Sequence, residues 1–582
     1  MRTVPNPRPH VPLSAKPPRL THLACLIALA ALALFPGLGG SARLSYHEAF
    51  VAQGAREILS SGEWTYPTIG GLPWLEKPPL PWWLAAGLGR LAGGVSEAVA
   101  RLPSALAAMA LVLGVAVIAA RHYGSTIGVL AGAVQATTAW TVLRGRLAES
   151  DVLLACLVTW TIVAFDAMLL AETELAAESD RAGPRWRLAR WMFFAFLGSS
   201  ALVKGIGFGA AIILPVVATL LLWQRAGTTL RRLCFPAGWI LAITLASAWP
   251  MLMIIRHGGG AITLWAKHVT DRLAGPSGPG SFAGEPWWEY VPTILAQALP
   301  WTPIAVLGAY RSLGRAVGLR YLIPGHRQRA LAPKLPSVVV SGDRLLWAWT
   351  AVPLALLAIP SVKNAHYAIA AQIPWSIWAG LALVRIGEKL RRRGWNRPRL
   401  RLAACGGFAS LALCWGLSLW LVAPRLDRRE IEWGFYEKVG RSLPASTSLT
   451  FLYDDWDRLP YDGPFGSFPH DLAVRLFYLG RPACWHWDAQ SLAGYDHAEC
   501  CHGHASLWPD DRRRTIVHEG PEFAVLGRER DLPELETLGH VEIVTRGPAF
   551  RADRSYSLFK IAKSTRESQL TRRPDANVNA TR

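Results

Sequence analysis

The chain has 582 residues, of which 51% are apolar and 18% are charged, and its formal net charge is +20. Its apolar residues are gathered into blocks of about 17–25 residues, the length of an α-helix that crosses the roughly 30 Å hydrocarbon core of a bilayer. This pattern excludes a soluble globular protein. The Lys and Arg residues lie in the loops between the blocks, which argues for a membrane protein and against nucleic-acid binding.

Eleven apolar blocks predict a mainly α, polytopic membrane helical bundle over residues 21–423. The blocks are 21–40, 98–120, 125–143, 152–171, 189–203, 206–223, 234–254, 291–310, 345–361, 366–384 and 402–423. The first block is either an uncleaved anchor or a cleaved signal peptide, and we favour the anchor because a loop motif follows it directly. Residues 1–20, which are Pro-rich and basic, are expected to form a cytoplasmic tail.

Basic residues concentrate in every second loop, most densely in 181–190, 311–334 and 389–401. The positive-inside rule places these loops in the cytoplasm, together with the N-terminus. The chain is therefore expected to be a multi-pass protein of the cell (inner or plasma) membrane. The segments expected outside are the first outer loop 41–97, then 144–151, 255–290, 361–367 and the chain from 424 onward.

The C-terminal region 424–562 is predicted to be a soluble, extracytoplasmic α/β domain, followed by a disordered tail at 563–582. Short β-like runs at 448–453, 515–517, 523–526 and 541–544 accompany a helical stretch at 427–442. Cys484, Cys500 and Cys501 lie among several histidines in this domain. They are compatible with a disulfide, a metal site or free thiols.

The first outer loop begins with Ser45, His47 and Glu48. Ser45-x-x-Glu48 has the spacing of a capping box and predicts a helix that runs to about Leu59. Because this helix is expected at the membrane surface, the Glu48 carboxylate is a candidate base. The alternative is that Glu48 only caps the helix and that His47 is solvated.

Lys77 stands between Glu76 and two prolines, just before a predicted helix at 80–92. Proline restricts the backbone of the residue before it, so Lys77 is expected to be held in an extended conformation. Its ammonium group is a compact charge suited to a phosphate. The alternative is an interfacial lysine paired with Glu76.

The short loop at 144–151 contains Arg144, Arg146, Glu149 and Asp151. Ionisable residues so close to the membrane indicate function. A local ion pair, such as Arg146 with Glu149, is the structural alternative. Lys204 interrupts a long apolar run, and it is expected to have a partner or to mark the end of a helical hairpin.

Two further outer segments carry candidate phosphate ligands. Arg272 precedes a stretch rich in Gly and Pro, which permits a flap, and its guanidinium can form two parallel hydrogen bonds with a phosphate. Lys363 and Tyr367 flank His366 at i and i+4 spacing, which places them on one face if the turn is helical. Solvated ion pairs and interfacial anchors are the alternatives.

Taken in order, these motifs resemble the membrane-embedded C-type glycosyltransferases (GT-C), in the protein O-mannosyltransferase superfamily that includes bacterial lipid A aminoarabinose transferases. The resemblance runs from about residue 40 to about residue 385. It rests on 76–80, 101–105, Lys204-Gly205, Trp249-Pro250, Arg272 with 286–290, 300–303, Ser361-x-Lys363 and His366-Tyr367.

This resemblance implies a polyprenyl-phosphate-linked sugar as donor and inverting transfer to a hydroxyl on a lipid, protein or polysaccharide at the outer side of the membrane. It implies that Lys77, Arg272, Lys363 and Tyr367 bind the donor phosphate. It also implies that Glu48 or His47 is catalytic, although the family has an Asp where this chain has His47. Roles in binding the acceptor or in positioning the site are expected for Glu76, Glu149, Asp151 and His366.

Two other functions compete with this prediction. One is a catalytically degenerate GT-C scaffold that binds glycan or lipid-linked sugar, which the replacement of Asp by His47 makes possible. The other is a transporter, which usually has repeat symmetry and polar residues at mid-membrane, and the sequence has no evident repeat. No metal ligands are assigned, and a divalent cation is the only cofactor considered.

Overall fold

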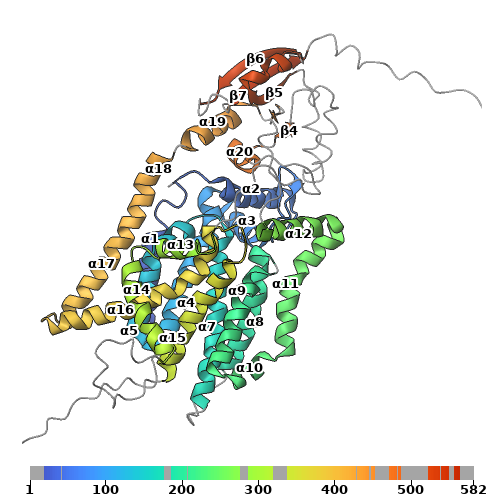
Figure 1. Ribbon diagram of the computed structural model, residues 1–582. Helices are drawn as coiled ribbons and strands as arrows, with labels where there is room; N and C mark the ends of the chain where they lie inside the picture. Colours follow the sequence, from blue (N-terminus) through green and yellow to red (C-terminus); the bar gives the residue numbers. More distant parts are fainter. Residues whose placement is uncertain are drawn as a thin grey trace, which may run out of the picture. The chain divides into compact units, whose positions relative to one another are not determined.

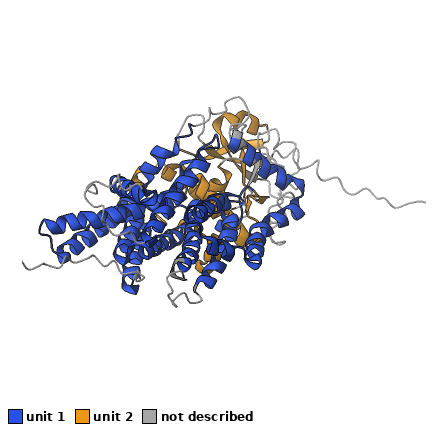
Figure 2. Cartoon of the chain, turned by 60° about the horizontal axis from the view of Figure 1, so that its bottom comes forward, with its two compact units in different colours: residues 1–38, 76–81, 101–422 blue, residues 39–75, 82–100, 423–582 orange. Residues whose placement is uncertain are grey.

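The computed structural model describes residues 19–40, 42–175, 185–205, 207–274, 286–318, 337–427, 429–444, 447, 449–452, 471–481, 483–486, 522–537, 539–548 and 556–563. The chain divides into two compact units, which Figure 2 colours separately. Unit 1 comprises residues 1–38, 76–81 and 101–422, and unit 2 comprises residues 39–75, 82–100 and 423–582. The predicted first outer loop thus shares a unit with the C-terminal region, and the domain boundaries predicted from the sequence remain a prediction.

Unit 1 is helical in its described part, and many of its helices run beside one another (Figure 1). Its elements are α1 (Leu20–Leu34), α4 (Glu97–Tyr123), α5 (Ser125–Thr137), α6 (Ala139–Gly145), α7 (Ser150–Leu175), α8 (Arg185–Lys204), α9 (Phe208–Gln224), α10 (Gly227–Leu233), α11 (Pro236–His257), α12 (Gly259–Ala274), α13 (Tyr290–Gln297), α14 (Thr302–Ala316), α15 (Ser337–Leu357), η3 (Ala365–Ala368), α16 (Ile369–Arg392), α17 (Arg397–Leu417) and the π-helical turn η4 (Ser418–Val422). The first residues of α4 belong to unit 2.

Within the described residues, five helical segments are long and apolar enough to span a membrane, and two bent pairs raise that number to seven. The bent pairs are α5 with α6, at 57°, and α13 with α14, at 115°. Each of the eleven predicted blocks coincides with a helix or a bent pair, so the prediction of a polytopic helical bundle is confirmed. Four of the matching helices (α1, α8, α9 and α15) are not among the seven spans, so a total of eleven spans remains a prediction.

The core of unit 1 is built by large side chains where helices cross. Phe165 on α7 lies against Phe193 on α8, and Trp347 on α15 lies against Trp378 on α16. Gly308 allows α14 to approach α16 closely, because a Cβ at this position would lie 2.0 Å from the carbonyl oxygen of Trp378. Small residues at such crossings are typical of helices packed within a membrane.

Unit 2 combines helices with two small sheets. Its elements are α2 (Tyr46–Ser61), β1 (Thr68–Ile69), β2 (Leu72–Pro73), α3 (Leu80–Ala92, entering from unit 1), α18 (Ala423–Leu426), α19 (Arg429–Ser442), β3 (Leu449–Leu452), α20 (Leu472–Leu479), β4 (Cys484–His486), β5 (Glu522–Arg528), η7 (Glu529–Asp531), α24 (Leu532–Leu535), β6 (Gly539–Arg546) and β7 (Tyr556–Lys563). The larger sheet has the order β4-β3-β5-β7-β6. Strand β3 is parallel to both neighbours, whereas β7 is antiparallel to β5 and β6.

The mixed sheet confirms the predicted α/β character of the C-terminal region. The predicted strands at 448–453, 523–526 and 541–544 correspond to β3, β5 and β6, and the helix at 427–442 corresponds to α19. The predicted run 515–517 lies outside the described residues. Most of the tail predicted at 563–582 does as well. Leu452, Val525 and Phe559 belong to a buried cluster that joins β3, β5 and β7.

Candidate active site

The candidate base lies at the N-terminus of α2 in unit 2. Ser45 is the N-cap: its side chain accepts from Glu48 N at 3.3 Å, and Glu48 Oε2 accepts from Ser45 N at 2.8 Å. The predicted capping box is therefore present. Glu48 is only 1% exposed, whereas His47 is exposed and its ring lies 4.1 Å from that of Tyr46. The imidazole is thus more accessible to solvent than the carboxylate.

Helix α2 is fixed to the hairpin and helix that follow it. The Glu57 carboxylate accepts hydrogen bonds from Gly70 N at 2.7 Å and from Gly71 N at 3.1 Å, at the turn between β1 and β2. Trp82 on α3 donates to Phe50 O at 2.8 Å, and Phe50 stacks on Trp74 with ring centroids 4.4 Å apart. These contacts limit the motion of the backbone that carries His47 and Glu48.

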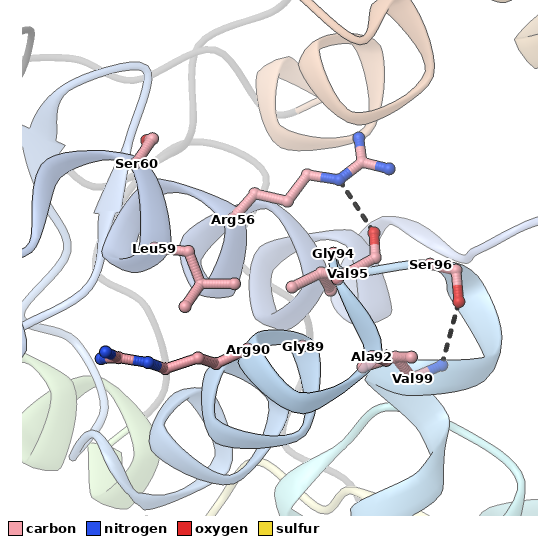
Figure 3. Close-up of a pocket in the computed structure, with 11 residues that line it drawn as sticks. Arg56, Leu59, Ser60, Gly89, Arg90, Ala92, Gly94, Val95, Ser96 and Val99 are labelled. Carbon is pink, nitrogen blue, oxygen red and sulfur yellow. Dashed lines mark hydrogen bonds between the residues drawn. The ribbon is translucent and has the colours of Figure 1, made fainter.

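A cavity of about 760 Å³ opens beside α2 and the segment that joins α3 to α4. It is lined by Arg56, Leu59, Arg90 and exposed backbone at Gly93 and Gly94, and by none of the predicted site residues. In Figure 3 the side chains of Arg56 and Arg90 point in opposite directions. The cavity therefore lacks the convergent cations that a phosphate site needs.

In unit 1, Lys204 and Asp151 form an ion pair, and each side chain is only 8% exposed. Lys204 is the last residue of α8, Gly205 has φ of +100°, and α9 begins at Phe208, so the predicted hairpin end is confirmed. The Lys204 ammonium also lies 4.2 Å from the centroid of the Tyr367 ring. Three elements, α7, α8 and η3, therefore meet at the Lys204 ammonium group.

His366 is the centre of the candidate cation cluster. It interacts electrostatically with Asp151, Lys204, Arg144 and Lys77. Its neighbour Tyr367 is 8% exposed and packs against Tyr290, Leu357 and Phe208. Lys77, Tyr367, His366 and Asp151 were all expected at the site, and unit 1 brings them together.

Lys204 was predicted only as a structural residue, and the geometry adds it to the candidate site. Because Asp151 pairs with it directly, the carboxylate orients the Lys204 ammonium beside Tyr367. The sequence signal was a single lysine within an apolar run, which requires a partner. That signal did not identify the partner.

Glu149 forms a local ion pair, but its partner is not Arg146, the arginine that the sequence analysis named as an example. Glu149 pairs with Arg144 at 2.8 Å, whereas Arg146 donates to Leu34 O at 2.7 Å. Burial lowers the pKa of Arg146 to about 10, and nearby Arg101 adds to the effect. Arg146 satisfies a carbonyl at the C-terminal end of α1, and so its direction is set by the helix end.

Lys363 and Tyr367 do not share a helical face. The short helix η3 begins at Ala365, so Lys363 precedes it, and the expectation of an i, i+4 pair is wrong. Lys363 is 7% exposed and donates to Pro360 O at 2.6 Å. Residues 358–364 between α15 and η3 have turn, bend or irregular backbone, so Lys363 does not lie in a helix.

Several predicted features lie outside the described residues. These are the side chain of Arg272 at the end of α12, residues 275–285 of the flap predicted at 270–288, Cys500 and Cys501, and the side chain of Cys484. Glu76 is half-buried beside Lys77. In the part of the chain that the structure describes, no three His, Cys, Asp or Glu side chains form a metal site.

Comparisons with known proteins agree with this architecture. Residues 76–254 match the family model of dolichyl-phosphate-mannose-protein mannosyltransferases. The undecaprenyl phosphate-alpha-4-amino-4-deoxy-L-arabinose arabinosyl transferase of Pseudomonas aeruginosa is 27% identical over 364 residues, covering 61% of this chain and 59% of the relative. That of Edwardsiella ictaluri is 27% identical over 391 residues, covering 64% and 62%. The chain thus matches about three fifths of the length of these relatives.

The fold is similar to that of ArnT from Cupriavidus metallidurans in its crystal structure with undecaprenyl phosphate. The TM-score is 0.66 at 16% identity, and the match covers 93% of this chain and 98% of the other. The two chains therefore share a helical membrane fold with a small C-terminal mixed sheet. The chain is therefore similar to membrane glycosyltransferases of the protein O-mannosyltransferase type, as the sequence resemblance predicts.

Proposed function

We propose that this protein transfers a sugar from a polyprenyl-phosphate donor to a hydroxyl acceptor at the outer side of the membrane, with inversion. The observation that carries the proposal is the cluster around His366, where Lys77, Lys204 and Arg144 interact electrostatically with one site. Such a cluster suits a lipid-linked phosphate, which is the leaving group of the reaction. The names of the relatives support an undecaprenyl-phosphate-linked aminoarabinose as the first donor to test.

In this mechanism the cations stabilise the phosphate as it leaves. The acceptor hydroxyl oxygen attacks the anomeric carbon, the bond from that carbon to the phosphate oxygen breaks, and its electron pair stays on the phosphate. The negative charge then developing is met by Lys77 and by Lys204, whose ammonium Asp151 orients before the reaction begins. Preorganised charges of this kind usually supply the largest part of catalysis. Arg272 and Lys363 remain predicted additional ligands.

The proton of the acceptor hydroxyl has to move to a base, and we assign this role to His47. Glu48 is buried and its carboxylate accepts from Ser45 N, so it is already occupied as a helix cap. His47 is exposed at the preceding position, and imidazole is the side chain that most often serves as a general base. Glu76, Glu149 and Asp151 remain predicted positioning residues.

The test measures release of undecaprenyl phosphate from radiolabelled undecaprenyl phosphate-4-amino-4-deoxy-L-arabinose by the purified full-length chain, with lipid, protein and polysaccharide fractions added in turn to supply the acceptor hydroxyl. Lys77→Ala and His47→Ala are expected to abolish release. Glu48→Gln is expected to retain it, because glutamine also completes a capping box. Lys389→Ala, which changes an exposed residue at the end of α16, is the matched control and should not affect release.

Two results would contradict parts of the proposal. Full release by both Lys77→Ala and His47→Ala would reject the site assignment. A wild-type protein that binds the donor but never releases undecaprenyl phosphate would favour the second candidate, a binding protein on a GT-C scaffold. The presence of His47 at the position of the family Asp is the observation that favours this second candidate.

A further inference from the structure

Helix α20, from the C-terminal region, contacts α2, the helix that carries His47 and Glu48. Both helices belong to unit 2. All eight residues of α20, Leu472–Leu479, are buried. The C-terminal region therefore packs on the helix with the candidate base.

The first contact is made by the hydroxyl of Tyr478. It accepts a hydrogen bond from Leu44 N at 2.6 Å and donates one to the Glu97 carboxylate. Burial and the neighbouring Glu97 raise the pKa of Tyr478, so its hydroxyl keeps the proton that it donates. Leu44 is fully buried and directly precedes the N-cap Ser45. Tyr478 thus fixes the backbone at the entry to α2.

The second contact lies further along α2. Arg56 NH1 donates to Phe477 O at 2.5 Å, and the guanidinium lies 3.6 Å from the centroid of the Phe477 ring. Arg56 Nε also donates to Val95 O at 3.0 Å, the dashed line between these residues in Figure 3. Phe477 and Tyr478 are adjacent in α20, so one short segment holds α2 at two points.

Arg43 joins the same entry segment to α19. Its Nε donates to Glu430 Oε2 at 2.7 Å, its NH2 contacts Glu437 Oε2 at 3.1 Å, and its guanidinium lies 5.0 Å from the Tyr478 ring. Arg43 NH1 also lies 3.8 Å from Glu97 Oε1. The capping box orients Ser45 and Glu48 relative to each other, whereas these contacts orient the whole helix relative to the C-terminal region.

We propose that Tyr478 is a positioning residue for the transferase reaction, because its hydroxyl holds the backbone at Leu44 and so sets the direction of His47. The C-terminal region then contributes to catalysis by holding α2. The catalytic role of Tyr478 rests on the proposed function. The contact between Tyr478 and Leu44 can be tested without activity, by hydrogen exchange. A small misplacement of a reacting group can reduce a rate by about 100-fold.

The experiment compares hydrogen exchange and donor kinetics for the full-length chain in detergent, as wild type, Tyr478→Phe and Tyr436→Phe. Tyr436 is a matched control because it is also buried in unit 2, and no described residue hydrogen-bonds to its hydroxyl. In Tyr478→Phe, amide exchange over residues 44–50 should accelerate about tenfold because a buried hydrogen bond is lost. The control should match wild type in this segment.

The kinetic readout separates positioning from general structural damage. Tyr478→Phe should lower kcat about 10- to 100-fold and leave KM for the donor near its wild-type value, because the donor phosphate is held elsewhere. Accelerated exchange with full kcat would overturn the positioning role. Unchanged exchange over 44–50 would show that the hydroxyl does not hold the segment, and it would overturn the inference as well.

Two further results are also informative. If wild type releases no undecaprenyl phosphate, the proposed function fails, and the exchange measurement still decides whether α20 holds α2. If Tyr478→Phe unfolds throughout, Arg56→Lys replaces it, since lysine keeps the charge but lacks the planar guanidinium whose separate Nε and NH1 atoms reach Val95 O and Phe477 O. Faster exchange over 46–61 with a lower kcat would then support the inference, and wild-type behaviour in both would overturn it.

Discussion

The ammonium group of Lys204 contacts the carboxylate of Asp151 where α8 ends and α7 begins, with both side chains 8% exposed. A charge buried to this extent requires its partner, because neither group can be solvated fully. The pair therefore has a structural role in addition to the proposed binding of phosphate. It holds the hairpin between α8 and α9 in place beside Tyr367.

We expect Lys204→Met to destabilise the protein by about 3–5 kcal/mol, because it leaves the buried Asp151 carboxylate unpaired. Asp151→Asn should have a similar effect. The double variant should lose less stability than the two single variants lose together, because it leaves no unpaired charge buried. Thermal unfolding in detergent measures all three, with Lys389→Ala as the exposed control. Strictly additive losses would contradict the pairing.

Gly308→Ala should destabilise the packing of α14 on α16. The added Cβ would lie 2.0 Å from Trp378 O, a backbone atom that cannot rotate away, and overpacking typically costs about 1–3 kcal/mol. Gly406→Ala in α17 is the control, because nothing lies within 4 Å of its added Cβ and alanine favours a helix by about 1 kcal/mol. Unfolding midpoints should move in opposite directions. An equal shift for both variants would contradict the close approach.

The sequence predicted the helices and strands better than the tertiary contacts between them. Apolar blocks are local signals, and each one coincides with a helix or a bent pair. The capping box at Ser45 and Glu48 is also local, and both of its hydrogen bonds are present. In contrast, the contact between Leu44 and Tyr478 joins residues 434 positions apart. No periodicity or spacing within one sequence specifies such a pair.

Only part of the candidate site was predicted, because motifs are local signals and long-range contacts are not. Lys77, His366 and Tyr367 were identified from motifs, and they meet in unit 1. The spacing of Lys363 and Tyr367 suggested a shared helical face, but helix geometry applies only where a helix forms, and the turn before Ala365 is irregular. The partner of Lys204 depended on tertiary packing. Glu149 does form a local ion pair, but with Arg144, because Arg146 donates to Leu34 O instead.

The ion pair of Glu430 with Arg43 should make the stability of unit 2 depend on pH. The hydrogen bond from Arg43 lowers the pKa of Glu430 below its ordinary value of 4.5. A carboxyl group with a depressed pKa contributes its full stabilisation above the unfolded value and loses it as the pH falls through the folded value. The side chain of Glu430 is 60% exposed, so solvent screening keeps the effect below about 1 kcal/mol.

Comparison of wild type with Glu430→Gln at different pH values measures this contribution. Amide exchange over residues 42–48 should be faster in the variant at pH 7, and the difference should shrink as the pH is lowered below 4. Glu437 lies in the same helix and also contacts Arg43, so Glu437→Gln indicates how much of the effect is specific to Glu430. A difference that grows on acidification would contradict the predicted sign.

The pH dependence of His47→Asp identifies the base. A general base acts in its deprotonated form, so if His47 is the base, kcat/KM should fall on acidification in the wild type. A carboxyl group loses its proton at lower pH than an imidazolium does, so the acidic limb of the profile should move to lower pH in His47→Asp. This substitution also introduces the Asp that the sequence resemblance implies at this position, and activity at neutral pH should be retained. If Glu48 were the base, the substitution would leave the acidic limb where it is, and Glu48→Gln rather than His47→Ala would abolish turnover.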